Sequence, residues 1–137
     1  MNIPLIDRSN YLKGLLITAR LDKELSSKEK EMLKTISEKL GFASDFFEET
    51  IRNLLTNKYI DSDPIVFSDK SIAASFLQDA ISLACVNNLI TKDEIEWLKS
   101  VAFVNDLNSD FIEKQINQQK NIKGSILNRE FALFSII

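Results

Sequence analysis

Few residues in this chain could carry out chemistry, because two reactive residue types, histidine and cysteine, are absent or nearly absent. Among 137 residues there is no histidine and one cysteine, Cys85. Without histidine, the chain cannot form the serine–histidine or cysteine–histidine pairs that activate nucleophiles, and it lacks the commonest zinc ligand. Any bound metal should therefore be a hard cation such as magnesium, calcium or manganese, held by oxygen atoms.

Two glutamates stand at matching places behind a hydroxyl residue. Ser26 precedes Glu29 by three positions, and Thr91 precedes Glu94 by three positions. This Ser/Thr-x-x-Glu spacing is typical of a capping box, in which the hydroxyl accepts a backbone N–H of the first helical turn and the glutamate accepts the N–H of the cap residue. We therefore predict that these four residues are helix caps.

Helical geometry turns the same two carboxylates toward apolar faces. At about 100° per residue, Glu29 falls within the arc of Met32 and Ile36, and Glu94 lies on the arc of Leu98. A partly buried carboxylate needs hydrogen-bond partners. The capping boxes meet this need by themselves. The alternative is that the loops before these helices place acidic groups around a cation or a basic group of a partner.

The elements that must position these residues are helical. Glycine and proline number 3 and 2, so long stretches can stay helical. Apolar residues at helical spacing predict a first helix capped at Asp7 or Ser9. Further helices are expected over about 27–40, from 44 (with Phe46, Phe47 and Ile51), over about 69–86, over about 92–104 and from 109. A last element contains Ile126, Leu127, Phe131 and Phe134. Cys85 lies in an apolar run, which favours a small buried side chain.

The sequence contains an internal repeat. Residues 25–51 aligned on residues 90–116 share nine identical positions out of 27, without a gap, where ordinary composition gives about two. The conservative pairs, such as Ile36 with Val101, fall on core positions. A repeat of this length with two copies is typical of a compact bundle rather than an open array.

We therefore expect one all-α domain over residues 1–137. It is a compact bundle of about six to seven helices, made from two tandem copies of a three-helix unit related by pseudo-two-fold symmetry. The first copy covers about residues 8–57, the second about 69–120, and a closing element about 125–137.

The stretch from Ala19 to Glu31, ARLDKELSSKEKE, followed by the pair Leu40-Gly41, resembles the signature of the tellurite-resistance TerB-like family. That signature has alanine, two residues, Asp-Gly, two residues, Ser/Thr, a charged pair and glutamate, and then an apolar helix ending in Leu-Gly. The resemblance covers about residues 8–116, with a degenerate second copy from Ala84 to Glu96. It implies an all-α fold and a role linked to bacterial stress or tellurite resistance.

The same resemblance implies a possible cation site, because divalent-metal binding by acidic residues has been proposed for the family. Asp22 matches the loop aspartate and Glu29 the helix-start glutamate, and Glu24 could add a third carboxylate. Lys23 replaces the glycine, and Asn87 replaces the acidic residue in the second copy. We therefore expect no cofactor, or a weakly bound calcium, magnesium or manganese ion.

Aromatic residues provide the candidates for partner binding. Phe103 lies on the polar face of its predicted helix, where the first copy carries Glu38, so it either contacts a partner or is a lone exposed ring. Phe131 and Phe134 belong to a strongly apolar end of the sequence, which should pack over the bundle in the same chain or dock on another chain.

Charge narrows the classes of partner. The chain has 17 basic and 20 acidic residues without a basic cluster, which disfavours nucleic acid. No apolar run approaches the roughly 20 residues that span a bilayer, and the first residues do not resemble a signal peptide, so we expect no membrane insertion and a cytoplasmic location. The prediction is a non-enzymatic binding or scaffold module with a protein partner or as a homo-oligomer. The alternative is a metal-dependent hydrolase that uses Asp22, Glu24 and Glu29.

Overall fold

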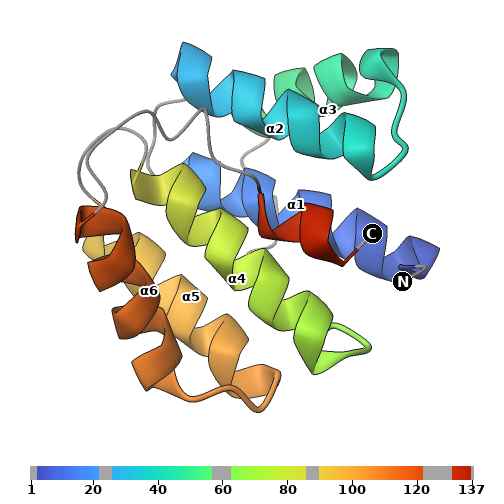
Figure 1. Cartoon of the computed structure of the whole chain (residues 1–137). Helices are drawn as coiled ribbons and strands as arrows, with labels where there is room; N and C mark the ends of the chain where they lie inside the picture. Colours follow the sequence, from blue (N-terminus) through green and yellow to red (C-terminus); the bar gives the residue numbers. More distant parts are fainter. Residues whose placement is uncertain (1–2, 22–25, 57–62, 86–89, 122–130, 137) are drawn as a thin grey trace.

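The described part of the chain consists of helices and connecting segments (Figure 1). The computed structural model describes residues 3–21, 26–56, 63–85, 90–121 and 131–136. It contains α1 (Leu5–Leu21), α2 (Ser27–Lys39), α3 (Ser44–Thr56), α4 (Lys70–Cys85), α5 (Lys92–Val104), α6 (Ser109–Asn121) and a 3₁₀ turn, η2 (Ala132–Ser135). No β-strand occurs within these ranges, so the predicted all-α class is confirmed.

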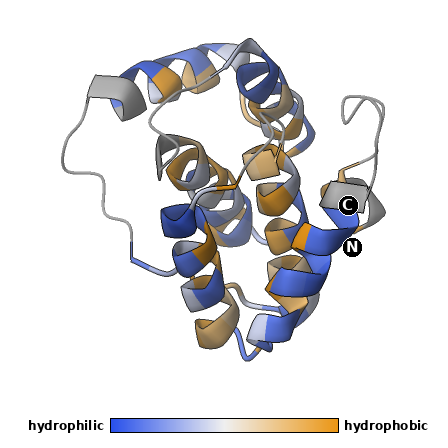
Figure 2. Cartoon of the chain, turned by 90° about the vertical axis from the view of Figure 1, so that its left-hand side faces the viewer, coloured by the Kyte–Doolittle hydropathy of each residue, from blue (hydrophilic) through white to orange (hydrophobic). Residues whose placement is uncertain are grey.

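The helices pack around a central pair. Helices α1 and α4 lie side by side in the middle, with α2 and α3 on one side and α5 and α6 on the other (Figure 1). Hydrophobic residues occupy the inward faces and hydrophilic residues the outward faces (Figure 2). This arrangement gives one apolar core that runs through both sides of the central pair.

Gly14 allows α1 and α4 to approach closely. A Cβ atom added to Gly14 would lie 2.5 Å from the ring of Phe76. That ring is fully buried and meets Tyr11 edge to face, with the ring centroids 5.5 Å apart. Glycine in the interior of a helix lowers the stability of the helix by about 0.5–1 kcal/mol relative to alanine. The close contact with Phe76 gives the physical reason for a glycine at this position.

Helix α1 begins earlier than predicted. The N–H of Arg8 donates to the carbonyl of Pro4 at 3.0 Å, so the first turn forms ahead of both Asp7 and Ser9, and neither residue is the cap. The Asp7 side chain is buried and accepts hydrogen bonds from the backbone N–H and the hydroxyl of Ser68. It therefore joins the start of α1 to the segment before α4.

Both predicted capping boxes are present. At α2 the Ser26 hydroxyl accepts the N–H of Glu29 at 3.1 Å, and the Glu29 carboxylate accepts the N–H of Ser26 at 3.3 Å. At α5 the corresponding distances between Thr91 and Glu94 are 3.1 and 2.8 Å. Both glutamates are 1% exposed, so the capping boxes account for the inward-facing carboxylates.

The two halves of the chain have matching helix boundaries. Helices α2 and α5 differ by 65 positions at both ends, and so do α3 and α6. The turns after α2 and α5 match as well, since Gly41 has φ 91° and Asp106 has φ 60°. Glycine adopts this left-handed conformation without steric cost, whereas aspartate does not.

Two smaller expectations need correction or extension. Cys85 is half-buried at the end of α4 rather than fully buried. Helix α6, whose end was not predicted, runs to Asn121. None of the helices within the described ranges combines the length and apolar content that crossing a membrane requires.

Substitutions at the two left-handed turns should change the free energy of unfolding in opposite directions. We expect Asp106→Gly to raise the free energy of unfolding by about 0.5–1 kcal/mol, because it relieves the strain at positive φ. Gly41→Asp should lower it by a similar amount, since an added Cβ would meet only the Arg8 guanidinium at 3.5 Å, an ordinary van der Waals contact, and the backbone conformation is what opposes a side chain. Urea unfolding of both variants measures the two changes, and equal signs would contradict the interpretation.

Candidate functional site

Of the three residues predicted for the cation site, the structure describes only Glu29. Asp22 and Glu24 lie outside the described residues. The Glu29 carboxylate is buried in its capping box. Within the described part of the chain, no three acidic or cysteine side chains gather in a way that could hold a metal ion. A cation at Asp22, Glu24 and Glu29 therefore stays a prediction from the family resemblance.

The three aromatic candidates differ in where they lie. Phe103 is 80% exposed on α5, as its place on the polar face predicted. Phe131 is half-buried and packs against the core of the same chain, directly before η2. The side chain of Phe134 lies outside the described residues, as do Ile126 and Leu127. The described part of the closing element thus packs within its own chain.

A buried polar network joins α1, α4 and η2. The Asp79 carboxylate accepts a hydrogen bond from the Tyr11 hydroxyl at 2.5 Å and from the N–H groups of Ala132 and Leu133 at 2.7 and 3.1 Å. The Tyr11 hydroxyl also lies 2.9 Å from the Ser75 hydroxyl. The first N–H groups of a helical turn lack acceptors within that turn, and Asp79 supplies one. We did not predict a role for Asp79 from the sequence, although a single acidic residue within the apolar α4 segment is a usable signal.

Burial controls the ionisation of this network. Desolvation raises the pKa of Asp79 to about 6, although hydrogen bonds from Tyr11, Ala132 and Leu133 favour the carboxylate. Desolvation, followed by the nearby Asp79 charge, raises the pKa of Tyr11 well above its usual value. Tyr11 and Asp79 are 0% and 1% exposed, so a substrate has no access to them. We interpret the network as the attachment of the closing segment to the core.

An apolar groove of about 320 Å³ lies between α1 and α3. Helix α1 forms one wall, helix α3 the other, and the aromatic rings of Phe42 and Phe46 stack at one end with their centroids 5.3 Å apart. The lining residues are Ser9, Leu12, Lys13, Leu16, Ile17, Phe42, Phe46, Thr50 and Asn53. Most of this lining is aliphatic or aromatic, and Lys13 provides its one charged side chain.

Phe46 departs from the sequence prediction. It was expected on the apolar face of its helix together with Phe47 and Ile51. Phe47 and Ile51 are indeed buried, whereas Phe46 is 49% exposed at the mouth of the groove. Its surroundings explain the difference, because the groove leaves one side of the ring without protein contact.

The corresponding face in the other half is closed by α6. Phe111, which is 65 positions after Phe46, is half-buried and packs against the core. Ile112 and Ile116 are buried beside it. The Gln119 amide donates to the Ser82 hydroxyl at 2.8 Å and ties the far part of α6 to α4. The two halves therefore use matching helices but differ in packing, because α6 contacts α4 more extensively than α3 contacts α1.

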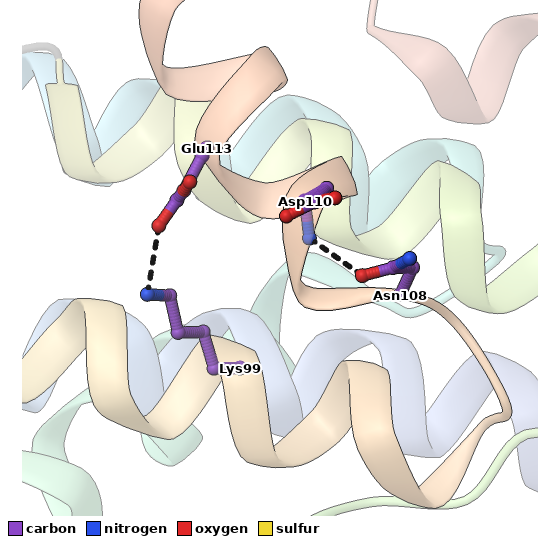
Figure 3. A network of polar contacts seen from close by, with 4 residues as sticks. All are labelled: Lys99, Asn108, Asp110 and Glu113. Atoms are coloured by element: carbon purple, nitrogen blue, oxygen red, sulfur yellow. Dashed lines mark hydrogen bonds and ion pairs between the residues drawn. The ribbon is translucent and has the colours of Figure 1, made fainter.

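The polar contacts at the surface of α6 do not cause this difference. Lys99 on α5 meets Glu113 on α6 at 3.2 Å, and the Asn108 side chain accepts the N–H of Asp110 at 3.0 Å (Figure 3). In the first half, Lys30 on α2 meets Glu48 on α3 at 3.5 Å. Exposed ion pairs contribute about 0–1 kcal/mol, so each half has a comparable weak link between its outer helices.

Exposed apolar residues extend the groove along α1. Leu5 and Ile6 are 64% and 68% exposed. At about 100° per residue they lie within the arc of α1 that faces the groove. The Arg8 guanidinium donates to the carbonyl of Leu40 at 3.4 Å, which places this end of α1 beside the turn that carries Phe42. Exposed apolar side chains gathered on one face of a helix are a feature of binding surfaces.

Known proteins provide no guide to the function of the groove. No family model, no curated protein and no solved structure matches the chain.

The raised pKa of Asp79 predicts a specific pH dependence. The native state holds a proton that the unfolded chain, with an aspartate pKa of about 3.9, has already released, so the contribution of Asp79 to stability falls as the pH rises from about 4 to about 6. Asp79→Asn should flatten this part of the stability curve. The measurement is urea unfolding at several pH values, with exposed Asp93→Asn as control. A variant curve parallel to that of the wild type would contradict the account.

Proposed function

We propose that the chain is a non-enzymatic, TerB-like binding module of the bacterial cytoplasm that holds a protein partner in the groove between α1 and α3. The observation that carries this proposal is the groove itself. Its floor is apolar, Lys13 is its one charge, and Thr50 and Asn53 add hydrogen-bonding groups at the side. An apolar concave surface with few polar groups is the usual composition of a binding site.

A protein partner is supported by the surface around the groove. Leu5, Ile6 and Phe46 are large apolar side chains that remain more than 45% exposed along its edges. A protein surface that filled the groove would cover these three side chains as well. The buried acidic groups Glu29, Asp79 and Glu94 support a non-enzymatic role, because each accepts backbone hydrogen bonds inside the fold.

We further propose that the bundle arose from two tandem copies of one three-helix unit, at about residues 8–57 and 69–120. The equal offset of the helix boundaries, the capping boxes and the left-handed turns support this interpretation. The central contact supports it too. Tyr11 donates a hydrogen bond to Asp79, and the residues 65 positions away from each, Phe76 and Gly14, also lie against each other, through close packing.

On this interpretation the binding site lies where the two copies differ. In the second copy α6 covers α4, with Phe111 and Gln119 in contact. In the first copy a groove remains between α3 and α1. The link to stress or tellurite resistance, and a weak cation at Asp22, Glu24 and Glu29, remain parts of the proposal that rest on the family resemblance.

Filling the groove provides the test. Thr50→Trp should place an indole ring in the groove and block it. Thr35→Trp is a matched control, because both threonine hydroxyls donate to the carbonyl four residues earlier, and Thr35 lies on α2 away from the groove. Peptides selected from a displayed library against the wild-type protein should lose at least about tenfold in affinity for Thr50→Trp and keep their affinity for Thr35→Trp.

Fluorescence anisotropy with the selected peptides measures both affinities, and circular dichroism verifies that the variants are folded. A library that enriches no binder, or binders that tolerate Thr50→Trp as well as Thr35→Trp, would contradict the proposed function.

A further inference from the structure

We infer that the occupant of the groove is an amphipathic helix of about three turns that places a carboxylate beside Lys13. This inference rests on the proposed function and specifies the chemistry of the partner. It follows from three properties of the groove: its length, the apolar side chains exposed along it, and the position of its single charge.

The length of the apolar surface matches a short helix. The α1 lining of the groove runs from Ser9 to Ile17, and the exposed Leu5 and Ile6 lie on the same face of α1 one turn before it. From Leu5 to Ile17 this face covers 12 residue steps, which corresponds to about 18 Å at 1.5 Å per residue. A partner helix of about 12 residues has the same length. Such a helix presents apolar side chains at spacings of three, four and seven residues, and these are the anchors that a hydrophobic groove between two helices accepts.

The exposed side chains favour a helix over a small apolar ligand. A small molecule sunk in the groove would contact Leu12, Leu16 and Ile17 on the α1 wall. It would leave Leu5 and Ile6 at the end of α1 in water, where they are now 64% and 68% exposed. A helix laid along the groove covers both regions at once, so it accounts for the whole apolar surface.

The charge of the groove specifies the polar side of the partner. Lys13 lies midway between Ser9 and Ile17, the first and last α1 residues of the lining. Four further charged residues stand next to lining residues, and their charges balance: Arg8 and Arg52 against Asp45 and Glu49. Lys13 therefore determines the sign that the groove presents. A carboxylate at the middle of the partner helix would form a charge-assisted hydrogen bond with Lys13, whereas a cation there would be repelled.

A charge exchange between groove and peptide provides the test. Two synthetic peptides of about 18 residues, long enough to be partly helical, carry the same apolar positions and differ in one central residue, glutamate or lysine. Wild-type protein should bind the glutamate peptide about tenfold more tightly than the lysine peptide. Lys13→Glu should reverse this preference. Lys34→Glu, which makes the same change on the exposed side of α2, should leave it unchanged, and fluorescence anisotropy measures all six affinities.

The possible outcomes separate this inference from the proposed function. Equal affinity of both peptides for the wild type, or a preference that survives Lys13→Glu, would overturn the carboxylate assignment. It would leave the groove as a binding site if Thr50→Trp still weakens both peptides. Binding of library-selected peptides or of dodecanoate, with neither designed helix bound, would overturn the helical partner. Loss of all binding would overturn both proposals.

Discussion

The structure depends on the close contact between α1 and α4. Gly14 lets the ring of Phe76 approach α1, and Tyr11 reaches across to the carboxylate of Asp79 at 2.5 Å. Helices α2 and α3 pack against α1, α6 packs against α4, and α5 contacts both central helices. The spacing between α1 and α4 therefore determines how the two outer pairs of helices lie relative to each other.

The two halves contribute different residues to this contact and differ in their buried hydrogen bonds. Asp79 accepts the N–H groups of Ala132 and Leu133 and so attaches the closing segment, whereas its counterpart 65 positions earlier is Gly14. A second difference follows α5, where Asn105 donates to the carbonyl of Ile65 at 2.7 Å and accepts the N–H of Phe67 at 2.8 Å. Buried polar groups thus hold the second half closed around its connecting segments.

Local features of the fold could be predicted from the sequence, because short-range chemistry determines them. The capping boxes of Glu29 and Glu94 need only a hydroxyl residue three positions earlier, and the helices follow from apolar spacing. The groove could not be predicted in this way. Phe46 and Phe111 are identical residues at equivalent positions, and their different exposure comes from how closely α3 and α6 approach the central helices. Asp79 was missed because its partners lie 53 to 68 positions away in the chain.

The most direct test of this account is a double-mutant cycle across the central contact. Gly14→Ala should lower the free energy of unfolding by about 1–3 kcal/mol, because its methyl group would overlap the Phe76 ring. The smaller side chain of Phe76→Leu should make room for that methyl group. The double variant is therefore predicted to be more stable than the sum of the single changes implies, by at least about 1 kcal/mol. Additive effects, or a Gly14→Ala variant as stable as the wild type, would contradict the claim that this contact determines the arrangement of the bundle.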